Sequence, residues 1–230
     1  MAQKKQEKEK ELEVGAILSR SEQFIEKNKK LLSYGIIGVA AVIGLIMAYH
    51  YGYAMPHNER AKIAIFRGEQ FFERDSFSLA LNGNGIDFEG FEAIADQYGS
   101  TKTGNLAKAY TGICYYKLGD PQTAIKWLKS YKGSDHQIAP AMTGLIGDCY
   151  VSTGETKEAI GYFEKAAAKA DNDLLSPVYL KKAGIAYESL NQYKEAIKVY
   201  TTIREKYNRS TEAMDIDRYI TRAEILAKQQ

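Results

Sequence analysis

The chain has 230 residues, of which 45% are hydrophobic and 26% charged, enough for one or two folded domains. The chain has 31 basic and 29 acidic residues, of which eight basic and six acidic residues lie in residues 1–30. Leu31–Tyr53 has none, so the rest of the chain holds 23 basic and 23 acidic residues and has no net charge. This balance argues against a nucleic-acid-binding surface, which needs an excess of positive charge. Two cysteines are too few for a disulfide framework, which excludes the disulfide-stapled class of small domains.

Residues 1–30 are predicted to form a charged cytoplasmic tail. Lys, Glu and Gln dominate residues 1–13, a composition typical of solvated, loosely ordered chain. Ser19 and Glu22 have the spacing of a capping box, which predicts a short helix next to the following apolar segment.

Residues 31–55 are predicted to be a transmembrane helix. Leu31–Tyr53 contains no Asp, Glu, Lys or Arg, and as a helix it would extend about 34 Å, against about 30 Å for the hydrocarbon core of a bilayer. Tyrosines lie near both ends, and Pro56 is expected to end the helix. A cleaved signal peptide and a buried core helix are the alternatives. The length of the apolar run and the lack of a small-residue cleavage site favour the span.

The lysines around the span predict its orientation. Lys27, Lys29 and Lys30 lie within four residues of its N-terminal end, and further lysines precede them. Because basic residues stay on the cytoplasmic side, the N-terminus is predicted to be cytoplasmic and the rest of the chain exported.

Residues 56–104 are predicted to form an N-terminal helical hairpin or a divergent repeat. Glu59–Ala80 has helical periodicity, with Ile63, Phe66, Phe71 and Phe72 as its apolar positions. The sequence LNGNG at 81–85 is typical of a turn, and FEGFEAIADQYG at 88–99 predicts a second helix.

Three nearly identical phrases follow: YYKLGDPQTAI at 115–125, YVSTGETKEAI at 150–160 and YESLNQYKEAI at 187–197. Around them, equivalent residues recur at spacings of 35 and 37: Gly112, Gly147 and Gly184; Ala124, Ala159 and Ala196; and Leu128, Phe163 and Tyr200. A helix–turn–helix phrase with a period near 34 resembles the tetratricopeptide repeat (TPR) family. The resemblance implies three TPR repeats in residues 105–210, at 105–138, 140–173 and 177–210.

Each repeated position has a mechanical reason. The small Gly of the first helix lets the second helix approach, and we expect the Ala of the second helix to fill that space. Gly119, like Gly154 and Asn191, is predicted to end a helix in the left-handed conformation. Asp120 is expected to cap the next helix and Pro121 to open it. A single hairpin cannot bury its apolar face, so the copies are expected to stack.

The repeat register also places the two cysteines and the C-terminal segment. Cys114 and Cys149 fall at one repeat position, about one helix diameter apart, and are predicted to be small core residues rather than a disulfide. Residues 211–230 are predicted to form an amphipathic capping helix, with Met214, Ile216, Tyr219, Ile220 and Leu226 on its apolar side. The predicted fold is therefore all-α: a transmembrane helix, then an α-solenoid.

Nothing in the sequence indicates catalysis, a metal site or a cofactor. His50, His57 and His136 include no pair at metal-ligand spacing, and there is no HExxH, CxxC, GxSxG or phosphate-binding loop. The sequence NGNG at 82–85 is not preceded by a predicted strand and favours a turn. The chain is predicted not to be an enzyme.

The remaining function for a solenoid is protein binding, on the face lined by the first helix of each repeat. The residues predicted to contact a partner are Leu106, Ala109, Ile113, Tyr116, Lys117, Asp148, Val151, Lys181, Ile185 and Glu188, with Ala141, Gly144, Ser152, Val178 and Ser189 completing the face. Some of these could instead pack against the N-terminal hairpin or the C-terminal helix.

From about residue 20 onward, the layout of basic tail, single span and exported repeats resembles the ancillary Sec translocon subunit family (YfgM-like). The stretch from DSFSLALNGNGIDFEG at residue 75 to YYKLGD, together with YLKKAGIAYESL at 179–190, resembles the form found in Bacteroidetes-type bacteria. The resemblance implies a single-pass protein of the bacterial inner membrane with a periplasmic TPR domain. Its implied partners are Sec translocon subunits, a membrane-anchored periplasmic chaperone or prolyl isomerase, and exported client chains. The alternatives are a structural subunit of another cell-envelope assembly or secretion complex, or a TPR domain that recruits factors in the cytoplasm.

Overall fold

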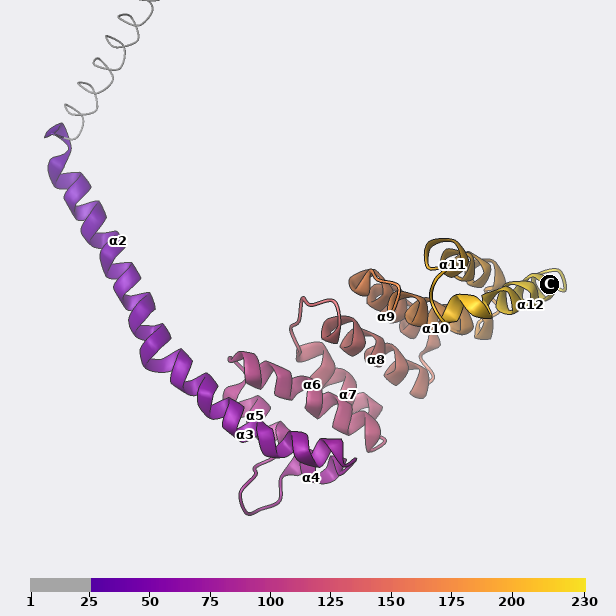
Figure 1. Cartoon of the computed structure of the whole chain (residues 1–230), viewed down its shortest axis with the longest axis horizontal. Coiled ribbons are helices and arrows are strands. Elements are labelled where there is room, and N and C mark those ends of the chain that lie inside the picture. Colours follow the sequence, from indigo (N-terminus) through magenta and orange to yellow (C-terminus); the bar gives the residue numbers. More distant parts are fainter. Residues whose placement is uncertain (1–25) are drawn as a thin grey trace, which may run out of the picture. The chain divides into compact units, whose positions relative to one another are not determined.

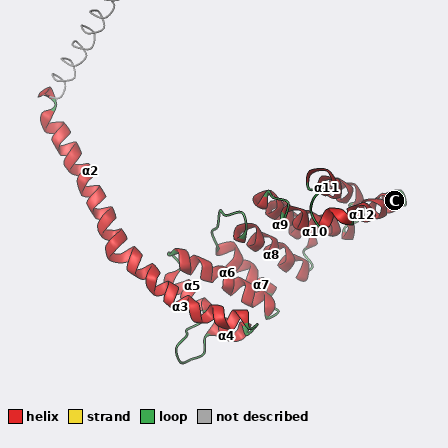
Figure 2. Ribbon diagram, in the orientation of Figure 1, coloured by secondary structure: helices red, strands yellow, loops and turns green. Residues whose placement is uncertain are grey.

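The computed structural model describes residues 26–230, and within that range every regular element is a helix (Figures 1 and 2). The chain divides into two compact units, residues 1–56 and 57–230, which are described separately. The predicted capping box at Ser19 and Glu22 lies outside the described residues. The all-α prediction, with a long apolar N-terminal helix followed by stacked hairpins, is confirmed.

The described part of the first unit contains α2 (Lys29–Tyr49) and the π-helix η1 (His50–Ala54). None of their residues is buried. Among residues 26–230, the helical stretch that contains α2 is the one long and apolar enough to cross a membrane. Membrane anchors and signal sequences share this length and composition.

Pro56 does not end the helix, contrary to the prediction. Helical geometry continues through η1 into α3 (Met55–Glu73), whose second residue is Pro56. A proline is tolerated in the first turn of a helix because the N–H group that it lacks is not needed there. The π turn directly before α3 shifts the hydrogen-bond register, which makes Pro56 such a first-turn residue.

The second unit consists of helices in chain order, which stack as hairpins (Figure 1). After α3 they are α4 (Phe77–Asn82), α5 (Phe91–Tyr98), α6 (Lys102–Lys117), α7 (Pro121–Ser130), α8 (Ile138–Ser152), α9 (Thr156–Ala170), α10 (Ser176–Ser189), α11 (Tyr193–Lys206), the short 3-10 helix η2 (Glu212–Met214) and α12 (Ile216–Ala227).

The helix predicted over residues 59–80 is two helices. Asp75 adopts a left-handed backbone (φ 55°) between α3 and α4, which interrupts the helix. The buried face of α3 also differs from the prediction: Ile65 and Gly68 are buried, whereas Ile63 and Phe66 are 77% and 59% exposed. Residues 65, 68 and 72 follow the three- and four-residue spacing of one helix face, which leaves 63 and 66 on another.

Aromatic side chains form the core of the first hairpins. The turn predicted at 81–85 is present: the Asn84 Oδ1 atom accepts hydrogen bonds from the following N–H groups, including that of Phe88 at 3.1 Å. It leads into α5, the predicted second helix, where Phe91 stacks on Tyr110 of α6 with ring centroids 4.7 Å apart. The Tyr115 hydroxyl donates to Glu92 Oε2 of α5 at 2.8 Å, which ties α6 to the preceding helix.

The repeated glycines are sites of close contact inside each hairpin. A Cβ added at Gly112, Gly147 or Gly184 would lie 2.6, 2.6 or 2.1 Å from the side chain of Leu128, Phe163 or Tyr200. The prediction that the alanine fills the space at the glycine is therefore wrong. The repeated bulky residue fills it. The alanines at 124, 159 and 196 are nevertheless fully buried. Each hairpin is closed by one large side chain lying over a glycine.

Each of the three phrases ends its first helix with the same turn. The carbonyls of Tyr115, Tyr150 and Tyr187 accept from the N–H groups of Asp120, Glu155 and Gln192 at 2.9, 2.8 and 2.9 Å. The intervening stop residues, Gly119, Gly154 and Asn191, have positive φ angles of 85°, 82° and 58°, as predicted. This bond pattern around a left-handed residue is the Schellman motif. Asp120 then caps α7 by accepting from the Thr123 N–H at 3.0 Å, and Pro121 begins the helix.

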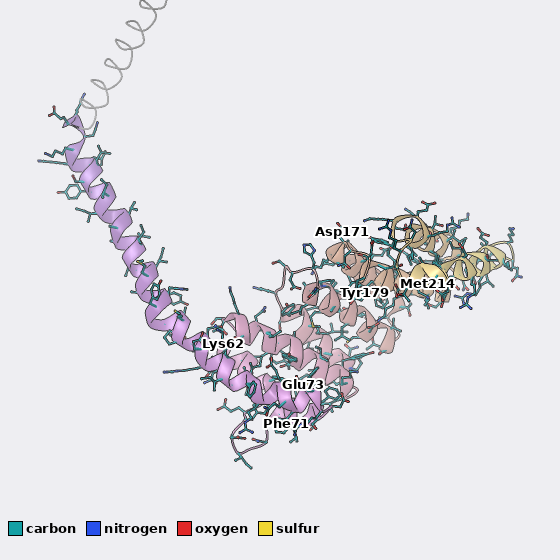
Figure 3. The ribbon with its side chains drawn as sticks, in the orientation of Figure 1. Lys62, Phe71, Glu73, Asp171, Tyr179 and Met214 are labelled. Atoms are coloured by element: carbon teal, nitrogen blue, oxygen red, sulfur yellow. The ribbon has the colours of Figure 1, made fainter. Side chains whose placement is uncertain are left out.

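Both cysteines are free and buried, as predicted. At the C-terminus, Ile216 and Ile220 of α12 pack against α11 and close the last apolar face. Contrary to the prediction, Met214 does not join this face. It lies in η2, labelled in Figure 3, and its side chain is exposed, at 85%. The chain bends at Asp215, so α12 begins only at Ile216.

Candidate protein-interaction surface

An apolar groove runs along the first helices of the first two repeats. It is about 540 Å³ in volume and is lined by Leu106, Ala109, Tyr110 and Ile113 of α6, by Gln137 at the start of α8 with Ile138, Ala141 and Met142, and by Leu174 and Leu175 before α10. None of these ten residues, all within the described range, carries a charge. We call this surface the apolar groove.

The groove has a closed floor and an exposed rim. Ala109 and Met142 form the floor and are 2% and 9% exposed. Ile138 and Leu174 stand at the rim and are 43% and 74% exposed. Burying the two rim side chains against a partner would remove apolar surface from water, which stabilises a complex by about 25 cal/mol per Å².

Short polar contacts hold the rim in place. Asn172 Oδ1 accepts from the N–H groups of Leu174 and Leu175 at 3.0 and 2.8 Å, which fixes the loop that presents the two leucines. The Ser176 hydroxyl donates to the Ala167 carbonyl at 2.8 Å and anchors the same loop to α9. The apolar rim is thus presented by an ordered loop, which limits the entropy lost on binding.

The predicted binding residues separate into two groups. Leu106, Ala109 and Ile113 line the apolar groove, together with Ala141. Ala109 is buried, and Gly144 is covered because the Tyr179 ring of α10 lies where its Cβ would be.

The residues predicted from the third repeat are mostly occupied inside the fold. Lys181 Nζ lies 2.7 Å from Asp215 Oδ1 and above the Tyr219 ring. Glu188 accepts from the Tyr200 hydroxyl at 2.7 Å and from Arg222 at 2.9 Å. These contacts hold the C-terminal cap, one of the alternatives that the sequence left open.

The other predicted positions lie outside the apolar groove. Asp148 forms an ion pair with Lys182 of α10 at 2.7 Å. Val151 and Ile185 remain about half exposed, at 48% and 46%. Tyr116 and Lys117 lie at the C-terminal end of α6, where Lys117 approaches the ring of Phe77.

Sequence reasoning missed the rim of the groove. Ile138, Leu174 and Leu175 lie at helix starts or in a loop, outside the helix positions that the repeat register identifies. The signal that could have found two of them is the adjacent leucine pair in the otherwise polar segment DNDLLSP at 171–177. Leu175 is partly buried, whereas Leu174 is 74% exposed, and an exposed leucine in a fixed loop can mark a surface that a partner covers.

Burial keeps the Tyr110 hydroxyl of the groove and the two core thiols in their neutral forms. Burial, with the nearby Glu69 carboxylate, raises the pKa of Tyr110 to about 12, so its hydroxyl stays neutral. Burial likewise raises the pKa of the Cys114 and Cys149 thiols to about 12, which suppresses the reactive thiolate. No cluster of His, Cys, Asp and Glu suited to a metal ion occurs within residues 26–230.

Comparisons with known proteins agree with this helical arrangement. Tetratricopeptide repeat family models match residues 141–175 and 179–210. The hairpins within residues 141–210 therefore match the tetratricopeptide repeat family. No curated protein matches the sequence.

Solved structures show the same fold. A crystal structure of the nearly identical TPR-like repeats of a putative kinesin light chain from Podosopora anserina superposes with a TM-score of 0.56 at 15% identity, covering 75% of this chain and 89% of that one. A single-residue variant of those repeats gives the same TM-score and identity over 76% of this chain. These structures show the fold alone, and the family that residues 141–210 match is usually non-catalytic.

Proposed function

We propose that this protein is a membrane-tethered, non-enzymatic scaffold that binds an apolar segment of a partner polypeptide in the apolar groove. The observation that carries the proposal is the uncharged groove with Ile138 and Leu174 exposed at its rim. A partner helix with apolar residues on one face is the ligand that suits such a groove.

We further propose that α2 anchors the chain in the bacterial inner membrane and that the repeats lie in the periplasm beside the Sec translocon. The apolar length of α2 supports the anchor, and Lys27, Lys29 and Lys30 at its N-terminal side support the orientation. The resemblance to the ancillary translocon subunits supports the neighbours: translocon subunits, a membrane-anchored chaperone or prolyl isomerase, and exported chains.

The groove is tested by crosslinking in living cells. A photoreactive amino acid is placed at Leu174, and at Lys157 as the control, because Lys157 is exposed on α9 outside the groove. We expect a discrete crosslinked protein from position 174 only, and we expect Ile138→Asp to reduce its yield. Equal products from both positions would contradict binding in the groove.

The location is tested separately. Protease added to intact spheroplasts should degrade the repeats if they are periplasmic, whereas protection would overturn the exported placement. Mass spectrometry of the product crosslinked at position 174 should identify a translocon subunit, its associated chaperone or an exported chain. A product from a different envelope complex would leave the groove assignment intact and overturn the translocon assignment.

A further inference from the structure

A second cavity, also about 540 Å³, lies where the first repeat meets the second, on the side of α8 that faces α7 and α9. Four lysines and no carboxylate are among its lining residues: Lys129 of α7, Lys132 in the α7–α8 loop, and Lys165 and Lys169 of α9. We call it the lysine pocket. Its size is within the range of ligand-binding clefts, about 300–1,000 Å³.

The pocket exists because α7 is short. Helix α7 has 10 residues, whereas α9 and α11, the equivalent helices of the next repeats, have 15 and 14. The loop that replaces the missing turns is shaped by Gly133, whose absent side chain leaves room for the Tyr131 ring. The floor is apolar and formed by Met142 and Ile146, which are nearly buried.

The four lysines differ in how they are held. Lys129 Nζ donates to the Tyr150 hydroxyl at 2.7 Å, and Lys169 Nζ donates to the Thr143 hydroxyl at 3.1 Å. Lys132 and Lys165 form no ion pair with any carboxylate in residues 26–230, although eight other ion pairs are present there.

The acidic residue of the α7–α8 loop is not among the residues that line the pocket. Asp135, in the same loop, accepts hydrogen bonds from the backbone N–H groups at the start of α8, including that of Gln137 at 2.9 Å. Those bonds hold its pKa below the usual value for a carboxyl group, although burial opposes them, so the carboxylate stays ionised and interacts with the start of α8. The pocket thus gathers four positive charges beside apolar and aromatic side chains, at a cost in mutual repulsion that an anionic ligand would remove.

We propose that the lysine pocket binds an acidic segment of a polypeptide, with carboxylates at the lysines and an aliphatic side chain against Met142 and Ile146. A polypeptide suits the pocket better than a bare anion because the floor is apolar and the Tyr131 and Tyr162 rings line its walls. This site goes beyond the apolar groove: it recognises a different chemistry and is lined mainly by other residues.

The test uses the full chain in a non-ionic detergent and fluorescence anisotropy of two labelled peptides. One peptide is made of glutamates around a single leucine, and its control has glutamine in place of every glutamate. We expect the acidic peptide to bind, the control peptide not to bind, and the affinity to fall as salt is raised. Equal binding of the two peptides would overturn the proposal.

Matched lysine variants locate the site. Lys132→Gln with Lys165→Gln should weaken acidic-peptide binding about tenfold, since each exposed charge pair changes an equilibrium constant by up to about fivefold. Both side chains are exposed and have no partner to lose, so the variant should fold. Lys126→Gln with Lys157→Gln, exposed lysines of α7 and α9 outside the pocket, should leave binding unchanged. An equal loss in both variants would overturn the site.

Two further measurements distinguish the lysine pocket from the apolar groove and a polypeptide ligand from a bare anion. Leu174→Ser in the apolar groove should not alter binding of the acidic peptide, so failure of the lysine pocket and failure of the proposed function are distinguishable. Tripolyphosphate should compete only weakly, because it leaves the apolar floor uncovered. Displacement of the peptide by tripolyphosphate at a lower concentration than the peptide itself would overturn the polypeptide assignment.

Discussion

The repeats meet at two junctions: the first junction joins the first and second repeats, and the second junction joins the second and third. Equivalent residues lie at both, but the contacts that they make differ. At the second junction, Tyr179 lies over Gly144, and Asp148 pairs with Lys182. The equivalent pairs at the first junction are Met142 with Ala109, and Leu145 with Ile113.

The repeated residues therefore determine the structure within each hairpin, whereas the contacts between neighbouring hairpins differ from one junction to the next. The second junction is closed by a large ring and an ion pair between neighbouring first helices. The first junction has the short helix α7, a flexible methionine and the lysine pocket beside it, and the apolar groove opens along its first helices. Both candidate binding sites therefore lie at the first junction, where packing is less complete than at the second.

The largest expected effect concerns the two thiols, which report on different regions. Cys149 packs in the same apolar cluster as Leu128 and Met142, at the first junction, whereas Cys114 packs in the cluster of the N-terminal hairpins. With a pKa of about 12, each thiol is ionised at about one part in 10⁴ at pH 8, so iodoacetamide should modify the folded protein about a thousandfold more slowly than the unfolded protein.

The order of modification tests the comparison. Because the first junction is less completely packed, we expect Cys149 to become reactive at a lower urea concentration than Cys114. Peptide mapping of samples taken along a urea series gives the two transitions separately. Coincident transitions would show that the first junction does not open on its own.

The next effect is a substitution at the second junction. Gly144→Ala would place a Cβ 2.1 Å from the Tyr179 ring, and overpacking of this kind typically costs about 1–3 kcal/mol in the free energy of unfolding. Gly161→Ala on α9 is the control. A Cβ there has no neighbour within 4 Å, so the better helix propensity of alanine should stabilise the protein by up to about 1 kcal/mol. Urea denaturation of the two variants should move in opposite directions, and a neutral Gly144→Ala would contradict the tight seal.

The sequence was sufficient to predict the hairpins but not the junctions. Gly119, Gly154 and Asn191 end their helices in the left-handed conformation. This depends on turn chemistry within a few residues, which a single sequence is enough to predict. The early end of α7 and the open space beside it depend on how two hairpins meet, as does the covering of Lys181 and Glu188 by the C-terminal cap. Those contacts join residues about 34 apart, and a repeat register predicts which residues are equivalent without predicting what fills the space between them.

A smaller effect concerns the tyrosine that opens each phrase. At the second junction the Tyr187 hydroxyl donates to Glu164 Oε1 at 2.8 Å, as Tyr115 does to Glu92. At the first junction Tyr150 instead accepts from Lys129 at 2.7 Å, because Trp127 stands where the glutamate would be. Tyr187→Phe should cost about 1–2 kcal/mol, because a hydrogen bond to a carboxylate is lost. Tyr150→Phe should cost less, since Lys129 is exposed and can be solvated.

The same tyrosines predict a pH dependence. Burial, with the hydrogen bond to Glu164, raises the pKa of Tyr187 to about 12, above the value of about 10 in the unfolded chain. The folded state therefore holds its proton more tightly, so this stabilisation is complete below pH 10 and is lost as the pH rises from 10 to 12. Thermal unfolding from pH 8 to pH 12 should show a smaller alkaline loss in Tyr187→Phe than in the unaltered protein. An identical loss in both would contradict the assignment.

The smallest effect concerns the ion pair of the second junction, which stands where the first junction has Ile113 and Leu145. Asp148 and Lys182 lie 2.7 Å apart but are partly exposed, so the pair should contribute less than about 1 kcal/mol and should weaken with salt. Replacing both residues by their counterparts from the first junction, Asp148→Ile with Lys182→Leu, should leave stability nearly unchanged, because a well-packed apolar pair replaces a partly desolvated ionic one. Lys182→Leu alone should cost more than the double variant, because Asp148 then faces an apolar side chain. Urea denaturation of the three proteins at low and high salt decides this. A double variant much less stable than the unaltered protein would mean that the ion pair, and not the shape of the helices, sets how the second and third repeats meet.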